Sequence, residues 1–183
     1  MRKLLLVPIL VICGNIFSQT LQQIESKRIG LPNGWSLTPV GKSLPLGDLP
    51  LNMAVSPSKK LVAVTNNGQS VHSLQLIDAV TDKVLVTTEI KKGWYGLKFS
   101  ADEKFLYASG GHDNWILKFA IYNVRETIIS PHTKQPPGKL VGRKLQLIDS
   151  IKLGDKWPNK IGPAGIETDD ARKIMYVVTR EDK

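Results

Sequence analysis

The fold of this chain is decided by the stretch Met53-Ala54-Val55-Ser56-Pro57-Ser58-Lys59-Lys60-Leu61-Val62-Ala63-Val64-Thr65-Asn66. It places a short apolar strand before a polar turn and a strongly β-forming strand after it. A similar stretch runs through residues 97–110, with Ser100 lying 44 residues after Ser56. A third copy occupies residues 166–179, 69 residues beyond the second. Polar turn residues and a lysine precede the second strand each time, as a hairpin requires. A repeated β-hairpin therefore organises the chain.

Two more strand candidates follow the first copy. Residues 73–77 alternate between polar and apolar side chains and end at Asp78, whose carboxylate suits a turn, and residues 84–88 follow directly. Four short antiparallel strands in 40–50 residues are the signature of a propeller blade. The sequence therefore predicts an all-β fold, namely a β-propeller of four-stranded antiparallel blades.

Blades are expected near residues 51–90, 95–151 and 164–183, the last incomplete, after a lead-in segment at 19–50. The predicted strands are 52–55, 61–65, 72–77 and 84–88, then 96–99, 105–109, 115–122 and 145–151, then 164–167 and 174–179. Residues 145–149 repeat the Leu-Gln-Leu-Ile-Asp of 74–78 but are assigned to a fourth strand instead of a third, which leaves an ambiguity. The alternative fold is a β-sandwich of about ten strands, which does not require the matched segments.

The number of blades is too small for a closed ring. Propellers close with 4–8 blades, whereas 183 residues supply about two and a half. An unclosed propeller would leave apolar faces and a strand edge uncovered. We therefore expect this chain to be the N-terminal fragment of a longer protein. The missing downstream blades would then pack against it as its first partners.

The repeats resemble those of the YVTN-repeat β-propeller family. The resemblance covers roughly residues 30–183 and rests on residues 54–57, 61–68, 76–78 and 81–84, and on Tyr176-Val177-Val178-Thr179. The chain resembles in particular the exported bacterial proteins in which such a propeller precedes an alkaline-phosphatase-like phosphoesterase domain. That resemblance implies a non-catalytic N-terminal domain, with the phosphoesterase metal ligands downstream of Lys183. The family's Ser-Pro-Asp-Gly turn is replaced here by Ser56-Pro57-Ser58-Lys59 and by residues 100–103.

Residues 1–18 are predicted to be a secretory signal peptide. Arg2 and Lys3 precede an apolar run from Leu4 to Ile12, which is too short to span a bilayer. Ser18 is a small residue suitable for cleavage. The single cysteine, Cys13, is disfavoured as a lipid-anchor site because Ile12 before it is not small. The mature protein is expected to be periplasmic or extracellular, free of cysteine, and without a transmembrane segment.

The basic character of the chain does not indicate a nucleic-acid partner. Removing Arg2 and Lys3 leaves 23 basic and 16 acidic residues. The lysines and arginines are spread beside predicted turns, as in Lys59-Lys60 and Lys91-Lys92, and no basic run has interleaved aromatics. We interpret them as a solvated basic surface.

The candidate binding residues are Gly111, His112, Asp113 and Asn114, a glycine-bearing loop after the second predicted hairpin. Glycines allow tight turns or close approach to a ligand, although a plain strand connection is the simpler interpretation. The histidines, His72, His112 and His132, show no metal-ligand spacing. We predict no metal site, no cofactor and no catalytic residue in this fragment. A basic, proline-bearing loop is expected at residues 123–144 and is a second candidate for docking a partner.

Three functional hypotheses follow. The first is a non-catalytic binding or scaffold domain of an exported phosphoesterase. The second is a lactonase-like hydrolase with a metal in the channel of the propeller, which would need acidic and histidine side chains from several blades. The third is a surface or adhesion protein made only of repeats. Fold resemblance alone does not fix function.

The signal peptide leads to a direct test. Cleavage after Ser18 should give an exported protein that begins at Gln19, because the small serine fits the peptidase and the charged and apolar segments before it are removed. Intact mass and N-terminal sequencing of the protein recovered from the cell envelope would measure this. A product that keeps residues 1–18, or one that begins at a lipid-modified Cys13, would contradict the assignment.

Overall fold

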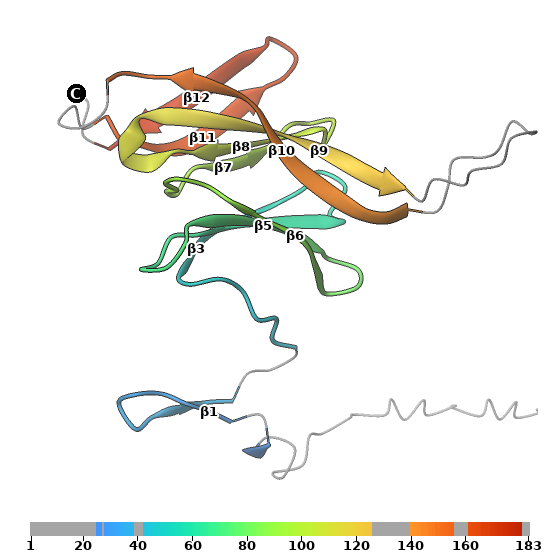
Figure 1. Cartoon of the computed structure of the whole chain (residues 1–183), viewed down its shortest axis with the longest axis vertical. Coiled ribbons are helices and arrows are strands. Elements are labelled where there is room, and N and C mark those ends of the chain that lie inside the picture. Colours follow the sequence, from blue (N-terminus) through green and yellow to red (C-terminus); the bar gives the residue numbers. More distant parts are fainter. Residues whose placement is uncertain (1–24, 27, 39–41, 126–139, 156–160, 181–183) are drawn as a thin grey trace, which may run out of the picture. The chain divides into compact units, whose positions relative to one another are not determined.

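The computed structural model describes residues 25–26, 28–38, 42–125, 140–155 and 161–180 (Figure 1). The chain divides between Ser43 and Leu44 into two compact units. The strands are β1 (Ile29–Gly30), β2 (Ser36–Leu37), β3 (Pro50–Val55), β4 (Leu61–Asn66), β5 (Ser73–Asp78), β6 (Lys83–Glu89), β7 (Leu97–Phe99), β8 (Phe105–Ser109), β9 (Trp115–Arg125), β10 (Leu140–Lys152), β11 (Pro163–Asp169) and β12 (Ile174–Thr179). One turn of 3₁₀-helix, η1, spans Gly111–Asp113. No helix in these described ranges is long and apolar enough to cross a membrane.

The first unit contains a small hairpin that the sequence patterns did not predict. Strands β1 and β2 pair antiparallel, with Ile29 opposite Leu37. The connection turns at Gly34, whose φ of 80° lies in the left-handed region where glycine is unstrained. Asn33 supports the turn by accepting a hydrogen bond from the Trp35 amide at 3.0 Å.

The second unit is all-β. Strands β3 to β6 form one four-stranded antiparallel sheet, and β7 to β10 form a second, each paired in chain order. Strands β11 and β12 form a two-stranded antiparallel sheet. All ten strands predicted after residue 50 are present, within a few residues at their ends. The ambiguous segment 145–149 lies in β10, the fourth strand of its sheet, as assigned.

The loop predicted at residues 123–144 is too long, because strands extend into it from both ends. Strands β9 and β10 continue into it as a two-stranded ribbon, with Asn123 opposite Arg143 and Tyr122 opposite Lys144 (Figure 1). Residues 121–124 are Ile-Tyr-Asn-Val, and β-branched and aromatic side chains favour continued strand pairing. Residues 126–139, the rest of that predicted loop, lie outside the described residues.

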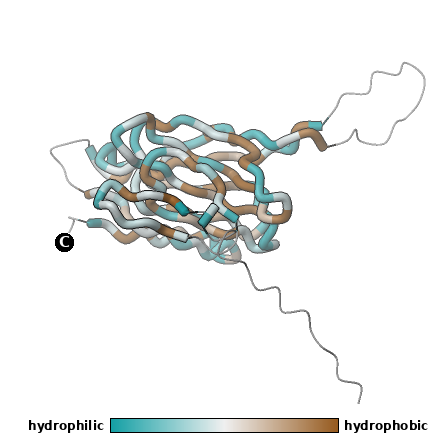
Figure 2. Tube along the Cα trace, turned by 90° about the horizontal axis from the view of Figure 1, so that it is seen from below, coloured by the Kyte–Doolittle hydropathy of each residue, from teal (hydrophilic) through white to brown (hydrophobic). Residues whose placement is uncertain are grey.

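The core lies between the two four-stranded sheets. The first sheet contributes Leu61, Ala63, Leu74 and Leu76, and the second contributes Leu97, Phe99, Leu106, Ala108, Phe119 and Leu145, all buried. Side chains alternate between the two faces of a strand, so one face of each sheet supplies this layer. Figure 2 shows the brown, hydrophobic segments gathered along the strands, with teal at many of the turns.

Like strands of successive sheets lie against each other. Strand β3 contacts β7, β7 contacts β11, and at the outer edges β6 contacts β10. The second sheet uses its other face for the third: Lys98 of β7 pairs with Glu167 of β11 at 2.5 Å, and the Ser109 hydroxyl donates to the Pro163 carbonyl. The second sheet is therefore packed on both faces.

The segment 44–49 covers part of the free face of the first sheet. The Gly47 amide donates to Gln75 Oε1 at 3.1 Å, and Asn66 Nδ2 donates to the same oxygen at 3.0 Å. Asn66 Nδ2 also donates to Ser73 Oγ at 3.1 Å. A Cβ at Gly47 would lie 2.7 Å from the Asn66 side chain, so only glycine allows this approach.

The first two hairpin turns share one chemistry. Ser56 Oγ accepts from the Leu61 amide at 3.2 Å, and Ser100 Oγ accepts from the Phe105 amide at 3.0 Å. Lys59 and Glu103 hold the left-handed position of their turns, with φ of 60° and 58°. These are the positions at which the Ser-Pro-Asp-Gly turn would have glycine, so the departure from that pattern introduces some backbone strain without changing the turn.

Carboxylates link successive turns. Glu103 of the second sheet accepts hydrogen bonds from the Ser58 amide and, at 3.0 Å, from Ser58 Oγ of the first sheet. Asp170, in the turn between β11 and β12, accepts from the Ala101 amide of the second sheet. Partial desolvation raises the pKa of Glu103, but hydrogen bonds from Ser58 and Ser56 together with the charge of Arg143 outweigh it and hold this pKa below its ordinary value of 4.5. The charged form of Glu103 is thus favoured in the folded state.

This lowered pKa makes a pH-dependent contribution to stability. The link is fully present above the unfolded-state pKa and is lost as pH falls through the lower folded-state pKa. Glu103→Gln should therefore destabilise the protein most at neutral pH, and the difference from wild type should shrink below pH 4.5. Urea unfolding across this range measures it. In a Ser58→Ala background the effect should be smaller, and a pH-independent difference would contradict this account.

Candidate functional site

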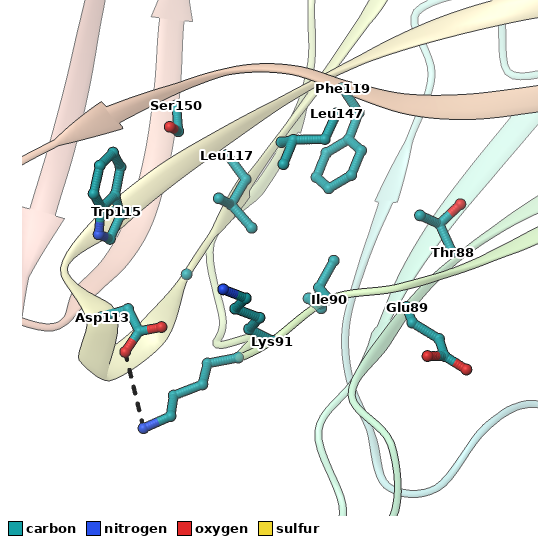
Figure 3. A pocket seen from close by; sticks show the side chains of 12 residues that line it. Thr88, Glu89, Ile90, Lys91, Asp113, Trp115, Leu117, Phe119, Leu147 and Ser150 are labelled. Carbon is teal, nitrogen blue, oxygen red and sulfur yellow. Dashed lines mark ion pairs between the residues drawn. The ribbon is translucent and has the colours of Figure 1, made fainter.

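A groove lies between the two four-stranded sheets, beside the end of β6. One wall is residues 88–92, the end of β6 and the connector after it, and the other comes from β9, β10 and the loop before β9 (Figure 3). Its volume is about 360 Å³, within the range of small-molecule sites. We call it the inter-sheet groove.

The floor of the groove is an exposed margin of the core. Ile90 and Phe119 belong to the buried layer between the sheets, and Leu117 packs against that layer. Trp115 and Leu147 add apolar surface higher on the β9–β10 wall, and Leu147 remains 51% exposed. Because Phe119 is only 1% exposed and Ile90 only 9%, the apolar surface open to a ligand comes mainly from Trp115, Leu117 and Leu147.

A β-bulge in β10 directs side chains into the groove. Leu147 is opposite Phe119, but the next pair is Asp149 with Lys118, so Ile148 is an extra residue. Without the bulge, Leu147 and Ser150 would point to opposite faces, because side chains alternate along a strand. With it, both line the groove.

His72 fixes the connector that forms the lower wall. Its backbone carbonyl accepts from the Ile90 amide at 3.0 Å, and its Nδ1 accepts from the Gly93 amide at 3.0 Å. Lys91 and Lys92 lie between these two anchored positions, and both are exposed. The anchoring therefore places two ammonium groups at the mouth of the groove.

The charges at the mouth are only partly matched. Lys92 Nζ lies 3.9 Å from Asp113 Oδ1, with side chains 51% and 22% exposed, so this ion pair is weak. Within the described residues, Lys91 forms no ion pair. Figure 3 shows its side chain directed towards the apolar side chains, while the Glu89 carboxylate points away from them.

The structure separates the four loop residues that the sequence singled out. Asp113 lines the inter-sheet groove. Gly111 and His112 face the other way, towards Trp94, Gly162 and Arg180, around a space of only about 10 Å³. That space is about one water in size. Gly111 has a φ of 57°, and a Cβ there would lie 3.1 Å from the Gly93 carbonyl oxygen, so the backbone favours glycine at this position.

Asn114 acts as a buried structural link. It adopts a left-handed conformation with φ of 59° at the end of η1. Its Nδ2 donates to the Asp155 carbonyl at 2.6 Å, and its Oδ1 accepts from the Gly162 amide at 2.9 Å. The side chain thus joins the loop to the chain segments on both sides of residues 156–160.

The described residues give no support for a metal centre. They contain no group of three histidine, cysteine, aspartate or glutamate side chains close enough to hold an ion. His72 is engaged with Gly93, and the His112 ring lies 6.2 Å from that of Trp94. His132 lies outside the described residues.

Sequence reasoning missed the groove itself. The pair Lys91-Lys92 was interpreted as solvated surface, and Ile90 and Leu147 had no distinguishing pattern. The two walls are separated by at least 18 residues in the chain, and only the stacking of the sheets brings them together. The one available signal was Asp113, which belongs to both the predicted loop and the groove.

The role of Asn114 can be measured directly. Asn114→Ala should destabilise the protein by about 2–4 kcal/mol, because two backbone groups lose their partners and a left-handed backbone loses a tolerant residue. Asn114→Gly should cost about 1 kcal/mol less, since glycine adopts this conformation without strain. Denaturant unfolding measures both.

His112→Ala is the matched control, because His112 is exposed and only two residues away. It should change the free energy of unfolding by less than about 0.5 kcal/mol. A larger loss for His112→Ala than for Asn114→Ala would contradict the structural assignment of this loop.

Comparisons with known proteins agree with the β-rich fold and go no further. No family model and no curated protein matches the chain. A solved chain described as Kuenenia stuttgartiensis hydrazine synthase is similar in structure, with a TM-score of 0.52 and 20% sequence identity. The match covers 77% of this chain but only 32% of that one. At this level of identity the likeness shows the fold alone: the chain has an all-β architecture shared with about a third of a larger protein.

Proposed function

We propose that this chain is part of an exported β-propeller that serves as a non-catalytic binding and scaffold domain. The observation that supports it most is the stacking of like strands, β3 on β7 on β11 and β6 on β10. In a propeller, successive blades repeat around an axis with the same strand innermost in each. The first strands follow that order at both junctions, with β11 also contacting β8, and the fourth strands β6 and β10 follow it at the first junction.

The packing on both faces of the second sheet favours a propeller over a sandwich. In a two-layer sandwich each sheet buries one face against the other. Here the Leu97 face of the second sheet packs on the first sheet, and the Lys98 face meets the third through Glu167. A carboxylate links the hairpin turns at both junctions, through Glu103 at the first and Asp170 at the second, although the two acids occupy different positions in their turns.

The proposal includes further blades and a downstream phosphoesterase domain in the same protein. Strand β12 exposes Ile174, Tyr176 and Val178 along one side, with exposed fractions of 43%, 53% and 66%. A contiguous apolar row of this kind is typical of a surface that another element covers. In the resembling family, the following blade and then the phosphoesterase domain occupy that part of the protein.

The other two hypotheses have less support. A lactonase-like hydrolase requires a cluster of metal ligands. Among the described residues, no three histidine, cysteine, aspartate or glutamate side chains lie close enough together to form one. A repeat-only adhesion protein differs from our proposal in lacking a catalytic domain. The native protein therefore distinguishes the three.

The test is to isolate the native protein from the cell envelope with antibodies against residues 44–180. We expect a mass well above the 20.3 kDa of this chain, together with hydrolysis of p-nitrophenyl phosphate. Asp113→Asn and His112→Ala should leave that hydrolysis unchanged, because a scaffold domain contributes no catalytic group.

Three results would contradict the proposal. A native mass near 20 kDa would exclude a single-chain propeller. A larger protein composed only of further repeats and lacking phosphoesterase activity would favour adhesion. Hydrolysis by this chain alone, lost on His112→Ala or Asp113→Asn, would favour an enzyme within the propeller.

A further inference from the structure

The inter-sheet groove combines an apolar floor with an unmatched positive charge at its mouth. We propose that it binds a small amphipathic anion, an aromatic or aliphatic carboxylate, whose apolar body packs on Trp115, Leu117 and Leu147 and whose carboxylate pairs with Lys91 (Figure 3). This adds ligand binding to the chain and does not rest on the scaffold role proposed above.

The charge distribution selects an anion. Asp113 and Lys92 already face each other at 3.9 Å, and Glu89 is turned away from the apolar floor. Lys91 is directed into the groove, and within the described residues it forms no ion pair. An ammonium beside apolar walls attracts a carboxylate more strongly than one in open water, because the local dielectric constant is lower.

The donor set selects a singly charged ligand over phosphate. Phosphate sites in proteins converge several backbone amides or guanidinium groups on the anion. At this groove the Ile90 amide donates to His72, and the Gly110 amide donates to the Trp115 carbonyl at 2.8 Å. The ligand therefore meets lysine side chains instead of a nest of free amides, which suits one carboxylate.

The size and lining of the groove limit the apolar part of the ligand. A volume of about 360 Å³ is at the lower end of small-molecule sites, enough for one ring or a short chain. The partly exposed ring of Trp115 provides a flat surface for such a body, whereas Phe119 is only 1% exposed and stays in the core. The bulge at Ile148 keeps Leu147 on the same wall.

The experiment uses three probes of one shape: phenylpropionate, phenylpropanamide and phenylpropylamine. Calorimetric titration of the intact protein should show binding of the acid that weakens as salt is added, since salt screens the charge pair. The amide should bind about tenfold more weakly, and the amine more weakly still. Octanoate should replace phenylpropionate competitively.

Matched variants locate the site. Lys91→Gln should weaken phenylpropionate binding about tenfold, whereas Lys91→Arg should preserve most of it and Lys83→Gln, at the far end of β6, should have no effect. Leu147→Ser should also weaken binding, while Ile148→Ser, the adjacent exposed residue outside the groove, should not. All four positions are exposed, so the five variants should fold.

Three results would overturn the proposal. Equal affinity for the acid and the amide, unchanged by Lys91→Gln, would show an apolar groove without anion selection. Preference for the amine would assign the site to a cation. Absence of binding of all probes at millimolar concentration, with wild-type folding confirmed by circular dichroism, would show that the groove is not a site for such ligands.

Discussion

The apolar layer between the two four-stranded sheets is the interaction on which the rest of the structure depends. Leu74, Leu76 and Leu106 are fully buried there, and Phe119 is nearly so. Burying a side chain of this size contributes about 1.5–3 kcal/mol, so the layer outweighs any single polar contact described above. The carboxylate links, the segment over the first sheet and the anchored connector at Ile90 all assume that the sheets are already held at this spacing.

The groove is a product of the same layer. Ile90, directly after β6, and Phe119 of β9 belong to the core and also line the groove. A ligand there would rest on side chains that folding has already fixed. Little ordering entropy would remain to be lost in the floor on binding, whereas Lys91 would still have to be ordered.

The sequence predicted the β-strands well because their signals are local. Alternation in β5, polar turns such as Ser56-Pro57-Ser58-Lys59 and the repeat of the hairpin each reside in a few consecutive residues. The end of β9 was predicted too early and the start of β10 too late, because cross-strand pairing carries the ladder past the turn signals. The hairpin at β1 and β2 was missed, since strands of two residues have no measurable period.

The candidate site was harder to predict because it is assembled from distant residues. The loop Gly111–Asn114 was chosen for its glycines and polar side chains, and the structure divides those residues among three roles. Gly111 satisfies the backbone, Asn114 links neighbouring segments, and Asp113 alone reaches the groove. A glycine-rich loop signals unusual backbone geometry, and that geometry serves packing as readily as binding. Lys91 gave no local signal, because the wall opposite it comes from β9 and β10.

The carboxylate links between turns have a direction. Each turn is secured by an acid from the sheet that follows it: Glu103 secures Ser58, and Asp170 secures Ala101. Each of these turn amides therefore depends on a residue that lies more than 40 positions further along the chain. A sheet taken without its successor would keep its strand pairing but would leave its turn amide to water, so the turns are the part of each sheet that its neighbour completes.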